Sequence, residues 1–323
     1  MICAVFLIFI AQAQTLEELQ SKIDAIEQAS SSARNMKQYE ELLHQTDSII
    51  NDLNQNDLES SRLAAQINYV RATLHMRNGQ LDQGITEAQK SIQLYEFNNL
   101  KNSESYLASI RILGILNIYK GDLDEALTLF IQTKDLSRTI LGDTSQMYAR
   151  SVMNLGSLYW ERRELDEALE SFRDAEPLIK RRHGDDSKDY GLYLLNVGNV
   201  YSDLSDYENG LNAYHRAHEL LEEHLGNDHP HVLLILNNLG TIYESIGNYE
   251  RAEVFYQQSL AGRLRVFGDN HRDYFQSLGN VARIQKTAGH IDKAIENQEQ
   301  KYPYPFHQKA WLALLFWPIN KED

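Results

Sequence analysis

The sequence predicts an all-α fold, a stack of helical hairpins, and three observations support this prediction. An aliphatic residue followed by a small residue recurs every 42 positions, as at Gly156, Gly198 and Gly240. Another small residue follows each of these glycines twelve positions later. The 323 residues include only 5 prolines, so long helices are permitted. Internal repeats of this length are typical of solenoids, in which each unit packs on its neighbours.

The repeat extends in both directions from Gly156 and gives seven copies. The first small residue of the copies is, in order, Ser30, Ala72, Gly114, Gly156, Gly198, Gly240 and Ala282. The second is Leu42, Gly84, Ala126, Ala168, Gly210, Ala252 and Ala294. Because Leu42 departs from the pattern, we expect a degenerate first copy and six clear copies after it.

Each copy is expected to form two helices joined by a short turn. The apolar faces have helical spacing and consist of Val152, Leu155, Gly156 and Tyr159 in the first helix and Leu165, Ala168, Leu169 and Phe172 in the second. The small residues at 156 and 168 should let the two helices approach closely. One hairpin cannot bury its apolar faces alone, so the copies are expected to stack.

Glycine and asparagine or aspartate are expected at the turns. Gly121-Asp122, Ser205-Asp206 and Gly247-Asn248 lie between the two helices of a hairpin, where they can end one helix and cap the next. The second helices are expected to end at glycines that can take the left-handed conformation, namely Gly142, Gly184, Gly226 and Gly268.

Composition excludes several classes of function. A net charge of −15 disfavours nucleic acid and anionic membrane surfaces as partners. Cys3 is the only cysteine, so no disulfide framework, zinc cluster or cysteine nucleophile is available further along the chain. The sequence contains neither a glycine-rich phosphate loop nor a G-x-S-x-G motif. We therefore expect a protein that is not an enzyme and needs no cofactor.

Two patterns resemble metal sites but lack the ligands that such sites need. Five histidines lie close together, at His215, His218, His224, His229 and His231, but no recurring carboxylate completes a site. Asp52-Leu53-Asn54-Gln55-Asn56 begins like a calcium loop, yet Leu63 stands where such a loop carries its bidentate glutamate. No metal site is predicted.

The N-terminus has features of an export signal. Ile2 to Ile10 form an apolar run, and Ala11-Gln12-Ala13 has the pattern of a signal-peptidase site. We therefore expect a signal peptide over residues 1–13 and a periplasmic or extracellular protein. The run is short and no Lys or Arg precedes it, so a cytoplasmic protein is the alternative.

The C-terminal end departs from the repeat. Pro303 and Pro305 should end the last helix, and the apolar run from Ala310 to Trp317 is far shorter than the roughly 20 residues of a membrane span. This tail is either the start of a truncated region or a segment that folds back over the last hairpin. The predicted organisation is N-terminal helices with a degenerate repeat over 14–62, a repeat array over 63–300 and an atypical tail over 301–323.

The spacing resembles that of the tetratricopeptide repeat family. Leu155-Gly156, Tyr159, Ala168 and Phe172 occupy the family's signature positions, strongly from about 105 to 300 and more weakly from 35 to 105. The usual repeat has about 34 residues. The 42-residue form with Leu225 to Val232 between repeats looks like the kinesin-light-chain type, which is also similar to arrays beside bacterial caspase-like (CHAT) domains. The resemblance implies a right-handed superhelical solenoid that binds a peptide or protein along its first helices.

Candidate binding residues lie on the first helices opposite the buried stripe. The set consists of Arg150, Asn154, Ser157, Trp160, Glu161, Asn196, Asn199, Asp203, Asn238, Thr241, Asn280 and Arg283. Asparagine recurs at 154, 196, 238 and 280 although it is a poor residue within a helix. Either these amides bind the backbone of an extended peptide, or they bond to the adjacent repeat and hold the spacing.

The leading hypothesis is a non-enzymatic scaffold that binds a peptide or partner protein in this groove. One alternative is the truncated sensory or regulatory region of a larger signalling protein or CHAT-type protease. The other is a cytoplasmic adaptor of the kinesin-light-chain kind. On the first hypothesis, changing Asn196 and Asn238 to Ala removes partner binding with little effect on stability.

Overall fold

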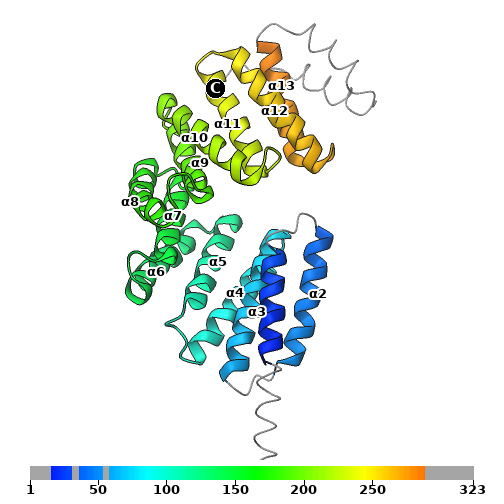
Figure 1. The fold of residues 1–323 in the computed structure, drawn as a ribbon, viewed down its shortest axis with the longest axis vertical. Coiled ribbons are helices and arrows are strands. Elements are labelled where there is room, and N and C mark those ends of the chain that lie inside the picture. The colour runs from blue at the N-terminus through cyan, green and yellow to red at the C-terminus, as the bar shows by residue number, and fades with distance from the viewer. Residues whose placement is uncertain (1–15, 31–35, 54–57, 288–323) are drawn as a thin grey trace, which may run out of the picture. The chain divides into compact units, whose positions relative to one another are not determined.

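The computed structural model describes residues 16–30, 36–53 and 58–287, and all regular structure within these ranges is α-helical (Figure 1). A helix over 16–30 is followed by α2 (Met36–Asp52), α3 (Leu58–Arg77), α4 (Leu81–Phe97), α5 (Glu104–Lys120), α6 (Leu123–Leu141), α7 (Gln146–Glu161), α8 (Leu165–His183), α9 (Lys188–Asp203), α10 (Tyr207–Leu225), α11 (Pro230–Ser245), α12 (Tyr249–Phe267) and α13 (Arg272–Thr287). The predicted all-α class is confirmed. The candidate signal peptide, residues 54–56 of the segment that begins like a calcium loop and the tail after residue 300 lie outside the described residues.

The chain divides into two compact units, Met1–Ala175 and Glu176–Asp323. The division falls inside α8, two residues before Pro177. A proline within a helix lacks the N–H for one backbone hydrogen bond and crowds the preceding turn, so α8 is locally weakened there.

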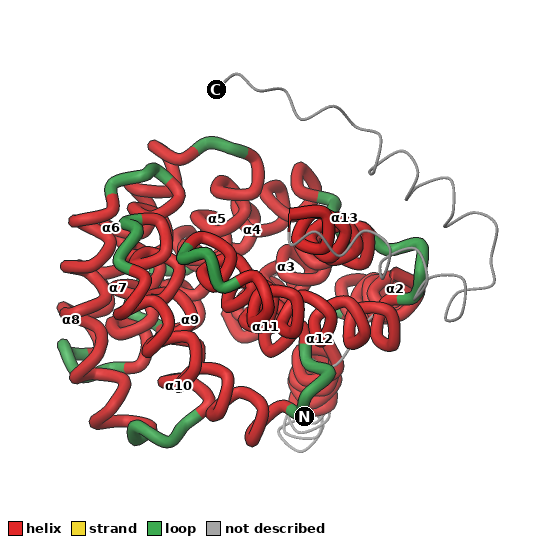
Figure 2. The backbone as a smooth tube through the Cα atoms, turned by 90° about the horizontal axis from the view of Figure 1, so that it is seen from above, coloured by secondary structure: helices red, strands yellow, loops and turns green. Residues whose placement is uncertain are grey.

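Within each unit, consecutive helices pack side by side and are joined by short loops (Figure 2). The first helices of successive hairpins also contact each other, α3 with α5 and α5 with α7 in one unit and α9 with α11 in the other. The first helices of successive hairpins therefore lie next to one another within each unit, as expected for stacked copies.

Serines cap the first helices on the same 42-residue period. The side chains of Ser103, Ser145 and Ser187 each accept a hydrogen bond of 3.2 Å from the backbone N–H three residues later. The corresponding positions one and two repeats further hold His229 and His271, whose Nδ1 atoms accept from the backbone N–H two residues later. These caps satisfy N–H groups that a helix leaves unpaired at its start.

The predicted helix-ending glycines are confirmed. Positive φ angles between 77° and 88° occur at Gly142, Gly184, Gly226 and Gly268. The turn inside each hairpin also requires a residue in the left-handed conformation. Glycine fills this position at 79, 121 and 247, and Arg163 (φ 64°) and Ser205 (φ 59°) adopt the same conformation in the two hairpins that have no glycine there. The turn geometry is thus set by the repeat even where the residue does not favour it.

The small residue of the first helix lies against an aromatic ring of the second. A Cβ atom added to Gly156 would lie 2.7 Å from Phe172 Cε1, which is closer than real contacts allow. The ring of Phe172 is 1% exposed. Gly114 and Phe130, Gly198 and Tyr214, and Gly240 and Tyr256 make the same pair. Because glycine has no side chain, the aromatic ring sixteen residues later can pack directly against the backbone of the first helix.

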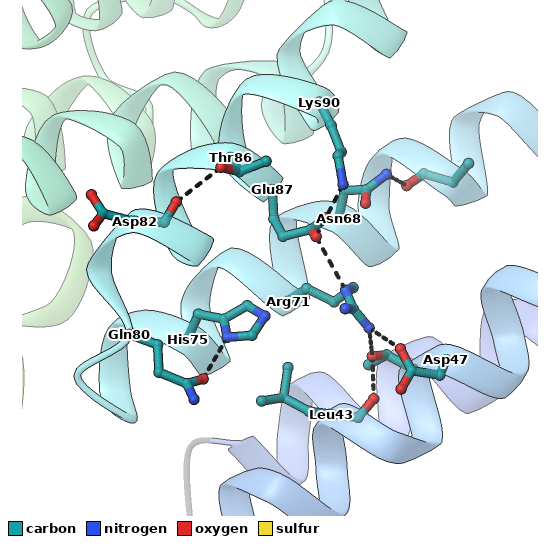
Figure 3. A network of polar contacts seen from close by, with 12 residues as sticks. Leu43, Asp47, Asn68, Arg71, His75, Gln80, Asp82, Thr86, Glu87 and Lys90 are labelled. Carbon is teal, nitrogen blue, oxygen red and sulfur yellow. Dashed lines mark hydrogen bonds and ion pairs between the residues drawn. The ribbon is translucent and has the colours of Figure 1, made fainter.

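A polar network joins α2, α3 and α4 in the first unit (Figure 3). Arg71 donates to Asp47 Oδ1 at 2.6 Å and to Thr46 Oγ1 at 2.7 Å, and its Nε lies 3.7 Å from Glu87 Oε1. Lys90 donates to the same Glu87 oxygen at 3.2 Å. Glu87 is 8% exposed, so these cations offset the cost of burying its charge. The degenerate first copy is attached through charges as well as through its apolar core.

The stability of the first unit is expected to fall as the pH rises from about 10 to 12. Tyr106 is 2% exposed and donates to Glu96 Oε1 at 3.0 Å, and burial together with that carboxylate raises the pKa of Tyr106 to about 12. A raised folded-state pKa stabilises the fold below the unfolded value near 10, and this stabilisation is lost as the phenol ionises. The free energies of unfolding of the wild type and of Tyr106→Phe, measured with urea, should converge as the pH rises over this range. A constant difference between the two proteins would show that ionisation of Tyr106 does not cause the loss.

Candidate peptide-binding face

The term first-helix face is used here for the surface that carries the predicted binding residues. In the second unit it consists of Asn196, Asn199 and Asp203 on α9, Asn238 and Thr241 on α11, and Asn280 and Arg283 on α13. Each of these side chains is half-buried or exposed. The structure therefore places all seven on the helices and at the surface where the spacing predicted them.

Asn238 links two successive repeats. Its Nδ2 donates to Asn199 Oδ1 at 3.0 Å and to Tyr214 Oη at 3.2 Å, and the Tyr214 hydroxyl donates to the same Asn199 oxygen at 2.7 Å. Burial raises the pKa of Tyr214, so the phenol remains a neutral donor. Because both Asn238 N–H groups have partners within the protein, the structural role of this amide is favoured over peptide binding.

Asn280 makes the corresponding link one repeat later. Its Nδ2 donates to Asn237 Oδ1 at 2.8 Å, and its own oxygen accepts from Arg283 at 3.3 Å. Arg283 also forms an ion pair with Glu244. Thr241 Oγ1 lies 3.2 Å from the hydroxyl of a buried tyrosine on α12. The face therefore carries two polar clusters, one that joins α9, α10 and α11 and one that joins α11, α12 and α13.

Asn196 differs from these two asparagines. It is half-buried in α9 and takes part in none of the bonds described above. Asp203, one helix end further along, is exposed. Among the four predicted asparagines of the second unit, Asn196 is therefore the one that takes part in no bond between repeats.

The first-helix face of the first unit includes five predicted residues, all on α7. Arg150 and Glu161 are exposed, and Asn154, Ser157 and Trp160 are half-buried. Ser157 bonds back to the Met153 carbonyl at 3.2 Å. The Nδ2 atom of Asn154 is buried without a hydrogen-bond partner. These residues are described separately from those on α9 to α13, which belong to the other unit.

A hollow of about 370 Å³ that sequence reasoning missed lies beside the second helices α10 and α12. Its lining is His215, Tyr243, Arg251, Val254 and Phe255. The rings of Tyr243 and Phe255 stack with centroids 5.4 Å apart, and the Arg251 guanidinium lies 5.3 Å from the Tyr243 centroid. Burial lowers the pKa of His215. The repeat spacing did not predict this hollow, because its lining residues come from three different helices.

Neither a metal cluster nor a spanning helix is found in the part of the chain that the structure describes. No group of three His, Cys, Asp or Glu residues within it is arranged to hold a metal ion. No helix among the described residues combines the length and apolarity that crossing a membrane requires. The clustered histidines instead make local contacts, such as His215 Nε2 with Tyr243 Oη at 3.1 Å.

Solved structures of repeat proteins share this fold. BtubC (BKLC) from P. vanneervenii is 20% identical, with a TM-score of 0.59 over 75% of this chain and 95% of that chain. A putative kinesin light chain repeat protein of Podosopora anserina is 17% identical, with a TM-score of 0.51 over 65% and 98%. A Rap protein complexed with competence and sporulation factor is 14% identical, with a TM-score of 0.58 over 91% and 78%. At these identities the likeness is one of fold.

No curated protein sequence matches the chain. The family model of the tetratricopeptide repeat matches three stretches, 106–181, 191–265 and 247–302. These stretches cover more than half of the sequence and begin where the sequence pattern becomes strong. Together with the helical hairpins and their kinesin-light-chain-like neighbours, they show that this chain belongs to the tetratricopeptide repeat family.

Proposed function

We propose that this protein is a non-enzymatic scaffold that binds a peptide or an extended segment of a partner protein on its first-helix face. The observation that carries the proposal is the row of half-buried polar side chains along successive first helices, in which Asn196 keeps its amide outside the bonds between repeats. An amide offers a donor and an acceptor to a peptide backbone, so recognition tolerates different peptide sequences. The complex of a Rap protein with its factor is a precedent for binding by a similar fold.

The structure changes the expectation for Asn238. Replacing it with Ala removes two bonds between repeats and leaves Asn199 without its Asn238 partner. A lost hydrogen bond with a part-buried partner costs about 1–2 kcal/mol. Asn238→Ala therefore reports on stability, whereas Asn196→Ala reports on binding.

The test uses peptides selected from a random library on the full-length wild-type protein. Asn196→Ala is expected to weaken the selected peptides about tenfold, which corresponds to one or two lost hydrogen bonds. Asn212→Ala is the matched control, because Asn212 is exposed on the second helix α10. It should leave affinity unchanged, and both variants should unfold at nearly the wild-type urea concentration. Equal affinity of all three proteins would sink the assignment of this face.

We also propose that the protein is exported. The support is the apolar run Ile2 to Ile10 followed by Ala11-Gln12-Ala13. Sequencing the N-terminus of the protein purified from its native cells tests this. A chain that starts shortly after Ala13 supports export, and a chain that starts at Met1 contradicts it.

A further inference from the structure

Ion pairs close the hairpin turns of the first unit on the 42-residue period. Lys120 Nζ at the end of α5 lies 3.1 Å from Asp82 Oδ1 in the first turn of α4. One repeat later, Arg162 directly after α7 pairs with Asp124 in the first turn of α6. Each pair therefore joins the turn of one hairpin to the second helix of the hairpin before it.

The second unit keeps the acid at this position but not the cation. Two repeats after Asp124 and Arg162, the equivalent residues are Glu208 in the first turn of α10 and Ile246 directly after α11. Glu208 is exposed and forms no ion pair within the described part of the chain, and Ile246 is 47% exposed. Because equivalent residues of a repeat occupy equivalent places, an exposed aliphatic side chain lies beside a carboxylate that has no cation.

Further exposed apolar side chains accompany Ile246. Tyr249 begins α12 and is exposed, and Val254 on the same helix is 52% exposed. Leu204 shows the same replacement of a cation one repeat before Ile246, and it is exposed as well. Single exposed aliphatic side chains are common on proteins, but several that gather at one turn are typical of an interaction surface.

The hollow beside α10 and α12 adjoins Ile246. Tyr243 lines this hollow and lies three residues before Ile246, so the two side chains share one face at the end of α11. The wall is fixed, because the Tyr243 ring stacks on Phe255 and the Tyr243 hydroxyl accepts a hydrogen bond of 3.1 Å from Arg251. A volume of about 370 Å³ accommodates an apolar side chain of a partner, and the exposed Val254 in the lining offers it an aliphatic contact.

The charges around this hollow are predominantly negative. Glu250 in the first turn of α12 is exposed and, like Glu208, has no ion-pair partner among the described residues. The Arg251 guanidinium is engaged over the Tyr243 ring. Burial and the neighbouring positive charges lower the pKa of His215, so this side chain is neutral at pH 7. Unpaired carboxylates on a chain with a net charge of −15 favour a partner segment that brings a lysine or arginine.

We propose that the turn edge of the second unit, which consists of Glu208, Ile246, Glu250, Val254 and the hollow, is a second docking surface. It takes a partner segment that carries an apolar side chain beside a lysine or arginine. The apolar side chain enters the hollow against Val254 and Ile246, and the cation pairs with Glu208 as Arg162 pairs with Asp124 in the first unit. The turn edge shares no residue with the first-helix face, so either surface can fail its test without the other.

The key variant is Ile246→Arg, which installs the residue found at 162. Its guanidinium should pair with Glu208 and close the turn edge from within the protein. An exposed ion pair adds little stability, so the Tm should stay within a few degrees of the wild-type value. Leu141→Arg is the matched control, because Leu141 is an exposed aliphatic residue at the end of α6 in the first unit.

The probe is a random peptide library selected on the full-length wild type, from which peptides that also bind Ile246→Arg are removed. This step discards peptides of the first-helix face. The remaining peptides should carry an apolar side chain next to Lys or Arg and bind Leu141→Arg and Asn196→Ala as tightly as the wild type. Glu208→Gln should weaken them about 3–10-fold and reduce the effect of salt, since one charge partner is lost. Val254→Ser should also weaken them about 3–10-fold, since an apolar contact is lost.

Four outcomes would overturn the turn edge as a docking surface for such a segment. They are the absence of remaining peptides, remaining peptides without Lys or Arg, equal affinity of the wild type, Glu208→Gln and Val254→Ser, and a loss of binding in Leu141→Arg. Sedimentation of the full-length proteins tests a second copy as the occupant. A wild-type dimer that Ile246→Arg converts to a monomer would assign the edge to that copy and contradict the proposal, whereas monomers in both cases support it. Weaker binding in Asn196→Ala alone bears only on the first-helix face.

Discussion

Gly240→Ala is expected to destabilise the second unit by about 1–3 kcal/mol, although alanine is the better helix former. A Cβ atom at this position would lie 2.6 Å from Cδ1 and Cε1 of Tyr256. The ring is 0% exposed, and its hydroxyl donates to Glu244 Oε2 at 2.8 Å, so it cannot move aside. Helix α12 must shift, which loosens its packing on α11. Urea unfolding followed by circular dichroism measures the loss.

Gly279→Ala provides the matched control within the same unit. Gly279 lies in the middle of α13, and no described atom lies within 4 Å of the position of an added Cβ. The same replacement should here stabilise the protein by up to about 1 kcal/mol, because only the helix propensity changes. If the two variants unfold at the same urea concentration, the contact with Tyr256 does not determine the need for glycine at 240.

The repeat spacing predicted the helices, their order and the glycines that end them, because those features depend on residues close together in sequence. It predicted less well which side chains meet. The small residues at 156 and 168 predicted a close approach of the two helices but not that the Phe172 ring lies against Gly156. The partner depends on how the two helices cross and on the volume of the ring, and neither can be read from spacing alone.

The candidate site shows the same limit. Spacing predicted equivalent positions for Asn196, Asn238 and Asn280, and they lie on the successive first helices α9, α11 and α13. It could not show that two of these amides already have partners. Whether an asparagine is satisfied depends on the residue about 40 positions earlier, which is Asn199 for Asn238 and Asn237 for Asn280. Hydrogen bonds between repeats thus decide which members of a regular row are left to bind.

In the first unit, the aromatic ring and the glycine of one hairpin should likewise depend on each other for their packing. Phe130 is 0% exposed, and its Cε1 lies 2.5 Å from where a Cβ on Gly114 would stand. Phe130→Ala is expected to cost about 3–5 kcal/mol, since it removes a large buried ring and leaves a cavity between α5 and α6. The free energy of unfolding in urea measures this loss.

The effect of Gly114→Ala on stability should then have opposite signs in the wild type and in Phe130→Ala. In the wild type the added Cβ collides with the ring and destabilises the protein, but in Phe130→Ala the ring is gone and the methyl group enters the cavity. The second change should therefore recover part of the loss, and the double-mutant cycle should show a coupling of about 2 kcal/mol or more. Additive effects would show that the two residues do not share one space.

Hydrogen exchange locates the damage in these variants. In a repeat array each hairpin contacts only its neighbours, so the lost stability is expected to stay close to the altered pair. Phe130→Ala should therefore speed the exchange of backbone amides in α5, α6 and α7, which pack on one another, and leave α11 to α13 as protected as in the wild type. Uniform loss of protection would mean that the whole chain unfolds as one cooperative body. In that case the 42-residue hairpin would describe the geometry of the protein but not its energetics.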